Sequence, residues 1–325
     1  MKKMTVQKWG RQALALGLLI ATGATSAQDF PNKPVRLVDP YAPGGSTGVV
    51  SRVLSRKFQE QTGQSLVVDN RPGAGSNIGS DIVAKASPDG YTLLLGTSSL
   101  AINASLYRTM PFDPLKDLAP IVGLIRAPNV LAVNASLPIR SVQEFIDYAR
   151  ARPGALNYGS SGNGTTNHMA MEQFKSMTGL QMTHIPYKGG GEALGALLGG
   201  QIQVMFNPAS TLAPHAKGGR LRMLAVSSDK RVEGLNLPTV AESGLPGFES
   251  SVWFGLFAPA GTSVPVIEKI NAEINRALKD KETADVLQAA GMTAVGGTPE
   301  QMKALLLQDT VRWATVVKAS GAKVD

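Results

Sequence analysis

The chain of 325 residues has no cysteine, only three histidines and few aromatic residues. Without cysteine it forms no disulfide and no thiolate metal site, and it cannot be a lipoprotein anchored through a modified cysteine. Three scattered histidines without a cluster of carboxylates give no metal-binding pattern, so we predict neither a metal site nor a cofactor. Hydrophobic residues make up 43% and charged residues 17%, a balance typical of globular proteins.

Long apolar runs are missing beyond the N-terminus. After residue 27 no run approaches the ~20 residues that a membrane-spanning helix needs. Within residues 1–27, an apolar run at 13–21 leads to Thr25-Ser26-Ala27, and it follows four basic residues, Lys2, Lys3, Lys8 and Arg11. This order is typical of a secretory signal peptide cleaved near Ala27, with an uncleaved anchor as the alternative. We expect the mature protein in the periplasm.

A strong excess of one charge is also absent. The formal net charge is +8, and removal of residues 1–27 would leave 28 basic and 24 acidic residues. This mild excess suits small anions, and no basic block with interleaved aromatic residues occurs. We therefore expect no nucleic-acid partner.

Apolar patterns typical of strands and helices alternate along the chain. The predicted strands are 35–39, 66–69, 91–95, 120–124, 130–133, 156–159, 183–186, 204–206, 223–227 and 253–258. The predicted helices are 46–61, 77–86, a short one after 99, then 141–150, 166–177, 192–198, 209–216, 265–278, 282–290 and 299–319. This alternation predicts an α/β fold of open, mainly parallel sheets with helices on both faces.

Two glycine-rich loops follow predicted strands and precede predicted helices. They are the segments 40–48 and 158–168. Where a glycine-rich turn connects a strand to a helix, free backbone N–H groups can point at an anion. The N-terminus of the helix also favours negative charge. Because ligands of such sheets bind at the carboxyl ends of strands, we expect the two loops to face one cleft.

Other motifs point to rival functions. Gly73, Gly75 and Gly79 resemble the G-x-G-x-x-G fingerprint of dinucleotide-binding proteins, but the third glycine comes one residue too late. The G-x-x-x-x-G-K-[ST] motif of a phosphate-binding P-loop does not occur. Ser160 and Ser161 do not fit the G-x-S-x-G spacing of a nucleophile elbow. A serine hydrolase would need a histidine beside one of them, whereas His168 is better placed to support the loop or touch a ligand. An exported esterase remains the alternative from another class.

Several motifs together resemble one family. They are Asn70-Arg71-Pro72-Gly73-Ala74-Gly75 with its extension to 79, and the segments 40–47, 87–94, 112–114, 157–162, 186–190, 238–244 and 296–300. With these motifs the chain resembles the periplasmic substrate-binding proteins of tripartite tricarboxylate transporters, the Bug family. The resemblance covers essentially the whole mature chain.

The resemblance implies two α/β lobes that close on a ligand like a Venus flytrap. Residues 28–126 with 253–325 would form the first lobe, and residues 127–252 the second. The implied ligand is a small carboxylate, held by backbone amides and bridging waters and delivered to membrane permease subunits. Delivery to a sensor kinase is an alternative, and we expect a monomer.

Both lobes are expected to contribute residues to the ligand site. From the first lobe we predict Tyr41, Gly45, Ser46, Thr47 and Thr97; from the second, Ser160, Ser161, Gly162, Gly164, His168, Tyr187 and Asn207. Members of the family usually have Asp where this chain has Gly48, and often Asp in place of Asn207. Both changes remove a negative charge, so we expect a ligand without an amino group, such as a dicarboxylate or an aromatic carboxylate.

Overall fold

The computed structural model describes residues 30–232 and 234–324, so the predicted signal peptide lies outside the described residues. The strands are β1 Val35–Asp39, β2 Leu66–Asn70, β3 Thr92–Thr97, β4 Leu118–Asn134, β5 Asn157–Ser160, β6 Thr183–Pro186, β7 Val204–Pro208, β8 Leu221–Val226, β9 Ser251–Pro259 and β10 Thr293–Gly296. The α-helices are α1 Ser46–Thr62, α2 Asn77–Ala84, α3 Ser99–Leu106, α4 Val142–Arg150, α5 Thr166–Thr178, α6 Gly190–Leu198, α7 Ala209–Lys217, α8 Val264–Lys279, α9 Lys281–Ala289 and α10 Pro299–Ser320, with a 3₁₀ turn at Ala74–Ser76.

The strands pair in the order β2-β1-β3-β9-β4-β7-β5-β6, and β8 and β10 both pair with β4. Pairing is parallel in the outer groups, where β1 joins β2 and β3, and β5 joins β6 and β7. Around β9 and β4 it is antiparallel. Alternation of strands and helices predicts the parallel groups but not this antiparallel centre, because β4 and β9 are joined to their neighbours by long-range connections.

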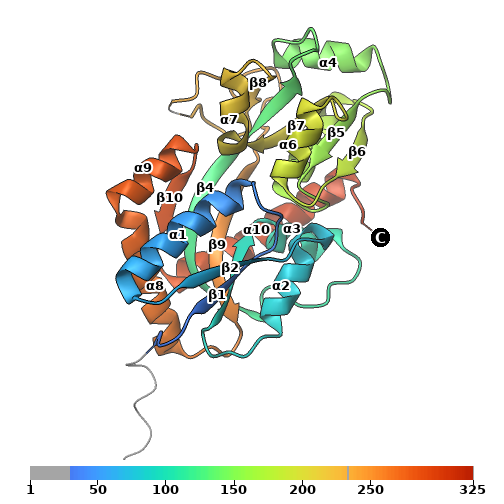
Figure 1. The fold of residues 1–325 in the computed structure, drawn as a ribbon. Helices are drawn as coiled ribbons and strands as arrows, with labels where there is room; N and C mark the ends of the chain where they lie inside the picture. Colours follow the sequence, from blue (N-terminus) through green and yellow to red (C-terminus); the bar gives the residue numbers. More distant parts are fainter. Residues whose placement is uncertain (1–29, 233, 325) are drawn as a thin grey trace, which may run out of the picture.

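One strand replaces the two predicted at 120–124 and 130–133. β4 continues through residues 125–129 because it pairs with β9 up to Pro128 and with β7 from Asn129. Pro128 has no N–H group to donate, and it stands where the pairing passes from one partner strand to the other. The strand therefore links both parts of the molecule (Figure 1).

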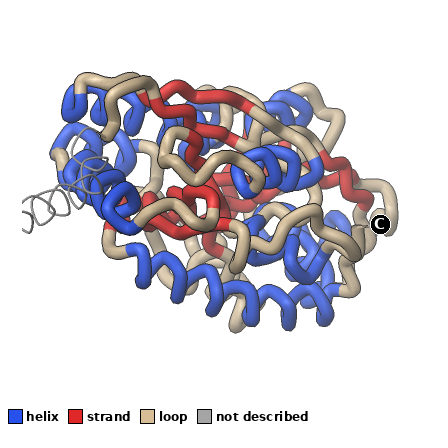
Figure 2. Tube along the Cα trace, turned by 90° about the horizontal axis from the view of Figure 1, so that it is seen from below, coloured by secondary structure: helices blue, strands red, loops and turns tan. Residues whose placement is uncertain are grey.

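Two lobes lie on either side of this link (Figure 1). We call β1–β3, β9, β10, the first half of β4, α1–α3 and α8–α10 the first lobe. The second lobe contains the rest of β4, β5–β8 and α4–α7. In both, helices lie outside the strands (Figure 2). The strand β10, which no strand pattern predicted, adds to the first lobe by pairing with β4.

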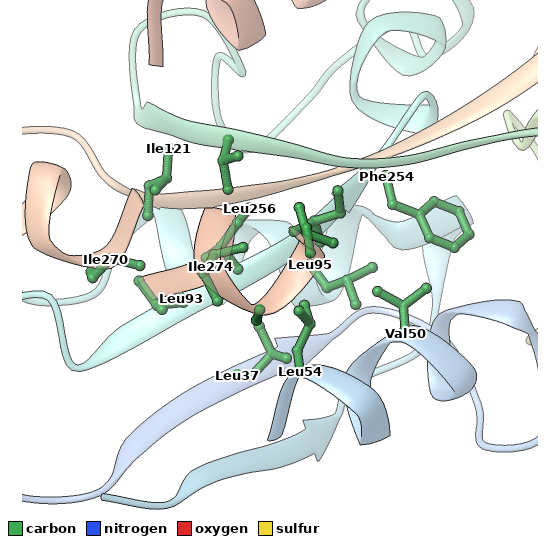
Figure 3. Packing of buried hydrophobic residues seen from close by; sticks show 14 of the residues in the cluster. Leu37, Val50, Leu54, Leu93, Leu95, Ile121, Phe254, Leu256, Ile270 and Ile274 are labelled. Atoms are coloured by element: carbon green, nitrogen blue, oxygen red, sulfur yellow. The ribbon is translucent and has the colours of Figure 1, made fainter. Parts of the chain in front are cut away.

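Each lobe has its own apolar core. In the first lobe, side chains from α1 and α8 point toward the sheet, among them Leu54 and Ile274 (Figure 3). In the second, Phe174, Phe206 and Phe248 form one cluster of aromatic rings. No helix among the described residues has the length and apolar character needed to cross a bilayer.

Candidate ligand-binding site

A cavity with about 420 Å³ of empty space lies between the two lobes. Its wall is formed by Tyr41, Gly45, Ser46, Thr47, Thr97, Ser99, Asn129, Ser161, Thr165, Thr166, Asn167, Gly190, Asn207, Pro208, Val252 and Phe254. None of these side chains carries a charge; most offer a hydroxyl, an amide or only backbone.

Asp39, at the end of β1, fixes the first glycine-rich loop through hydrogen bonds. The Tyr41 N–H donates to Asp39 Oδ1 at 3.2 Å, and the Ser51 hydroxyl donates to Oδ2 at 3.3 Å. Asp39 is fully buried, and this burial raises its pKa to about 6 although the hydrogen bonds act in the opposite direction. The loop is therefore fixed by a buried acid that protonates readily.

The carboxyl end of β3 completes the first-lobe side of the wall. The Tyr41 hydroxyl lies 2.9 Å from both Thr97 Oγ1 and Ser99 Oγ. Burial raises the pKa of Tyr41, so this hydroxyl stays neutral. Three hydroxyl groups thus share hydrogens at one edge of the cavity, which allows them to donate or accept as a ligand requires.

Asn167 organises the second glycine-rich loop. Its Nδ2 donates to Ser161 Oγ at 2.8 Å, and its Oδ1 accepts from the Ser161 N–H at 3.3 Å and from the Thr165 hydroxyl. The side chain therefore ties the end of β5 to the start of α5. Ser161 and Thr165 are held on the wall as a result.

A stack of rings supports this loop from behind. The His184 ring is stacked against both Tyr158 and His168, with centroid distances of 4.7 Å and 4.2 Å. His168 Nδ1 accepts the Gly164 N–H at 3.2 Å, so this nitrogen carries no proton. Burial lowers the pKa of His168 to about 4 and that of His184 to about 3. Both imidazoles are neutral at physiological pH.

The structure places a histidine beside Ser160, but not in a nucleophile arrangement. Ser160 Oγ lies 2.6 Å from His184 Nε2. Ser160 is fully buried, is not part of the cavity wall, and also shares hydrogen bonds with the backbone of Gly162. Ser161, which does line the cavity, bonds to Asn167 instead of a histidine. The pair supports the loop and has no access to a substrate.

The starts of five helices lie on the wall. They are those of α1, α3, α5, α6 and α7, through their first residues or N-caps. None of the five has a hydrogen bond from its N-cap side chain, whereas α4, α9 and α10 do. Helix N-termini carry partial positive charge and free N–H donors, so the wall favours an anion without any basic side chain.

The lobes touch around the cavity. The Ala42 N–H donates to the Lys188 carbonyl at 3.1 Å, across the two lobes. A Cβ added to Gly164 would lie only 1.7 Å from Asn103 Oδ1, and one added to Gly75 only 1.9 Å from the Asn163 carbonyl. This is a closed arrangement, which glycine permits by its lack of a side chain.

Seven of the predicted site residues line the cavity: Tyr41, Gly45, Ser46, Thr47, Thr97, Ser161 and Asn207. Five do not, namely Ser160, Gly162, Gly164, His168 and Tyr187. His168 and Ser160 belong to the ring stack, and Gly164 faces the other lobe. The Tyr187 N–H donates to the Ser160 carbonyl at 3.0 Å, so this residue positions the loop from the neighbouring strand.

The wall also contains residues that were not predicted: Ser99, Asn129, Thr165, Thr166, Asn167, Gly190, Pro208, Val252 and Phe254. Thr165, Thr166 and Asn167 are part of the predicted second loop, and Gly190 belongs to a Gly-Gly-Gly turn, so a signal existed for these. Asn129, Val252 and Phe254 lie on β4 and β9, whose meeting behind the cavity has no sequence signal.

The two positions that depart from the family pattern lie in different surroundings. Asn207 is on the wall, where its Nδ2 donates to the Gly190 carbonyl at 3.2 Å. Gly48 is not on the wall, and a Cβ there would lie 3.4 Å from Arg52 Nη1. A direct influence on the ligand is therefore available to Asn207 but not to Gly48 in the closed arrangement.

Comparison with known proteins supports this description, beginning with the class of fold. Two α/β lobes closed over a cavity at their helix N-termini are the architecture of periplasmic binding proteins. A solved structure from R. palustris, described as bound to adipate, shares 38% sequence identity with a TM-score of 0.89 and covers 91% of this chain and 100% of its own. A second, MatC from Rhodopseudomonas palustris with bound malate, shares 30% identity with a TM-score of 0.85 and covers 89% and 100%.

The sequence then defines the family. Residues 50–322 match the model of the TctC family, which is described as "Tripartite tricarboxylate transporter family receptor". Protein BugT of Bordetella pertussis is 39% identical over 321 residues, which is 97% of this chain and 98% of that protein. The chain belongs to the TctC family of solute-binding proteins.

Proposed function

We propose that the protein captures a small carboxylate in the periplasm, closes its lobes over it and presents the closed form to a membrane permease. Residues 28–126 with 253–325 would move as one lobe and residues 127–252 as the other, about a hinge in β4 and β9. The limits of one apolar core support this division, since this cluster ends at Ala127 and resumes at Val252, each one residue from a proposed boundary. The mature chain would begin after residue 27.

The observation that carries the proposal is the composition of the cavity wall. Five helix N-termini without side-chain caps meet there, and no charged side chain takes part. Backbone N–H donors in a closed, poorly solvated site make strong hydrogen bonds to a carboxylate. Helices from both lobes contribute, which suits an anion with two acidic ends.

The ligands of relatives agree with this reading. Adipate and malate, named with the two R. palustris structures, are both dicarboxylates. Both lack an amino group. In this chain no aspartate or glutamate lines the cavity, so a ligand ammonium group would have no carboxylate of the wall to pair with directly. We propose a dicarboxylate without an amino group as the ligand class.

The roles of the wall residues follow from their groups. The N–H groups at Ser46, Thr47 and Thr166 would bind carboxylate oxygens. The hydroxyls of Tyr41 and Ser161 would donate to the same or the opposite end of the ligand. His168 and Ser160 would act indirectly, by holding the second loop in place.

A thermal-shift screen tests the function. The mature protein would be heated with succinate, glutarate, adipate, malate, citrate, benzoate and aspartate in turn. A ligand at ~100 times its dissociation constant adds about 2.7 kcal/mol to the free energy of unfolding, so the midpoint should rise clearly with a dicarboxylate. Ser161→Trp should remove this shift because its indole fills the cavity.

Ser105→Trp is the matched control, since Ser105 is exposed on α3. It should keep the shift. A midpoint that rises with aspartate and with no dicarboxylate would contradict the ligand class. No shift with any of the carboxylates would contradict the function itself.

A further inference from the structure

Asn129 is a fully buried wall residue whose side-chain amide has no hydrogen-bond partner among the described residues. Three asparagines line the cavity. The amides of Asn167 and Asn207 are engaged with each other and with neighbouring groups. Neither Nδ2 nor Oδ1 of Asn129 has a hydrogen-bond partner among the described residues, although the residue is 0% exposed. Swapping the two amide atoms of Asn129 would not give both of them a partner.

The backbone around Asn129 fixes its side chain in place. Its N–H donates to Ser227 Oγ at 2.8 Å, and its carbonyl accepts the Ser227 N–H at 2.8 Å. The Ser227 hydroxyl in turn donates to the Ser250 carbonyl. Asn129 also stands opposite Pro208, where β4 passes from β9 to β7. The amide is thus presented by rigid strands, and its two polar atoms are what remains unused.

An unpartnered buried amide is unfavourable in the free protein, so its presence on the wall of a ligand cavity indicates a partner that arrives with the ligand. A carboxylate satisfies only the Nδ2 donor, because it has no hydrogen to give. The Oδ1 acceptor needs a donor from the ligand. A neutral group that both donates and accepts satisfies the whole amide.

We propose that Asn129 selects a hydroxylated dicarboxylate. The ligand hydroxyl would donate to Oδ1, and an oxygen of the ligand would accept from Nδ2. An ammonium group also donates, but the wall has no acidic side chain to balance its charge. The neighbouring Val252 and Phe254 leave the rest of this end of the cavity apolar. The inference rests on the proposed function and names its ligand more narrowly.

Calorimetric titration with matched ligand pairs tests the inference. The pairs are succinate with malate, and glutarate with 2-hydroxyglutarate, with aspartate as the amino analogue. The wild-type protein should bind the hydroxylated member of at least one pair about tenfold more tightly, since a site built for a hydroxyl discriminates against the analogue without it. Asn129→Leu should bind both members of that pair equally.

Asn134→Leu is the matched control on the same strand. The Asn134 amide is already used, with Nδ2 donating to the Leu197 carbonyl at 2.6 Å and Oδ1 accepting the Ser136 N–H at 2.8 Å. This variant should keep the hydroxyl preference but lower the melting temperature. Asn129→Leu should leave the melting temperature of the ligand-free protein unchanged or higher, because it removes unpartnered polar atoms.

The outcomes separate the inference from the function. If the wild type binds plain and hydroxylated dicarboxylates equally, or if Asn129→Leu keeps the preference, the role of Asn129 is wrong while carboxylate capture stands. Tighter binding of aspartate than of malate also overturns the inference. If no dicarboxylate binds, the proposed function fails, and the inference fails with it.

Discussion

The two glycine-rich loops both contribute to the cavity wall, but the buried groups that support them have opposite chemistry. Beneath the first loop lies an acid, Asp39, whose pKa is raised to about 6. Behind the second lies a pair of imidazoles, His168 and His184, whose pKa values are lowered to about 4 and about 3. Burial is the main cause in each case, because it disfavours the charged form of any group.

This difference gives the loops opposite responses to acid. Protonation makes Asp39 neutral, which its buried position favours. Protonation makes the histidines charged, which their positions disfavour. The loops are also fixed by different contacts. The first is held by hydrogen bonds to the Asp39 carboxyl, and the second by a stack of rings and by the amide of Asn167.

The largest effect is expected where the second loop meets the first lobe. Gly164 has a φ of +74°, and a Cβ there would lie 1.7 Å from Asn103 Oδ1. Gly164→Ala should therefore prevent the closed contact and weaken dicarboxylate binding by at least ~100-fold, about 2.7 kcal/mol. Calorimetric titration measures this loss.

Gly154→Ala is the control, since Gly154 has the same φ of +74° but no atom within 4 Å of an added Cβ. Both variants should lose roughly 1–2 kcal/mol of stability from the left-handed backbone. Only Gly164→Ala should lose binding. Equal binding by the two variants would show that the contact with Asn103 is not needed for closure.

The second effect is a loss of stability in acid through the ring stack. His168 titrates at about 4 when folded and near 6.5 when unfolded. The neutral His168 makes its full contribution to the free energy of unfolding above pH 6.5. This contribution falls as the pH falls toward 4, and roughly 3 kcal/mol of it is lost at pH 4. Urea unfolding from pH 7 to pH 4 should show this fall in the wild type.

His168→Gln cannot titrate and should reduce that pH dependence to the part that His184 contributes, while its amide oxygen can still accept the Gly164 N–H. If His168→Gln and the wild type lose stability in parallel on acidification, the lowered pKa of His168 is wrong.

A smaller effect of opposite direction is expected from the first loop. The Asp39 carboxyl has a pKa of about 6 when folded against 3.8 normally, so its contribution to stability is present at low pH and is lost as the pH rises through 6. Its negative charge also opposes an anion in the cavity. Acidification from pH 7.5 to 5.5 should tighten dicarboxylate binding roughly fivefold, about 1 kcal/mol.

Asp39→Asn keeps the shape and removes the charge, so its affinity should not change over this pH range. Calorimetric titrations at the two pH values make the comparison. Tighter binding on acidification in both proteins would assign the effect to another group, such as the ligand itself.

The sequence predicted most elements of the fold because apolar periodicity and glycine-rich turns are local signals. β1 was predicted with the bounds that the structure shows, and α5 and α10 differ by a single residue. The continuous β4 was missed because its central residues are extended only through pairing with β9 and β7, which is a long-range effect. β10 was missed for the same reason.

The sequence predicted those residues of the cavity wall whose place follows from the course of the backbone. In the first loop, Tyr41, Gly45, Ser46 and Thr47 all line the cavity. In the second, only Ser161 does among the five predicted residues, because side-chain direction depends on packing against Tyr158 and His184. A sequence shows that a loop follows a strand, but not which of its side chains turn toward the ligand.

The central claim is that the two loops close as one clamp on a dicarboxylate. Small-angle X-ray scattering of the mature protein measures this most directly, with and without the dicarboxylate that gives the largest thermal shift. The radius of gyration should fall on ligand addition in the wild type and stay constant in Gly164→Ala. A saturating ligand that leaves the radius of the wild type unchanged would contradict the account.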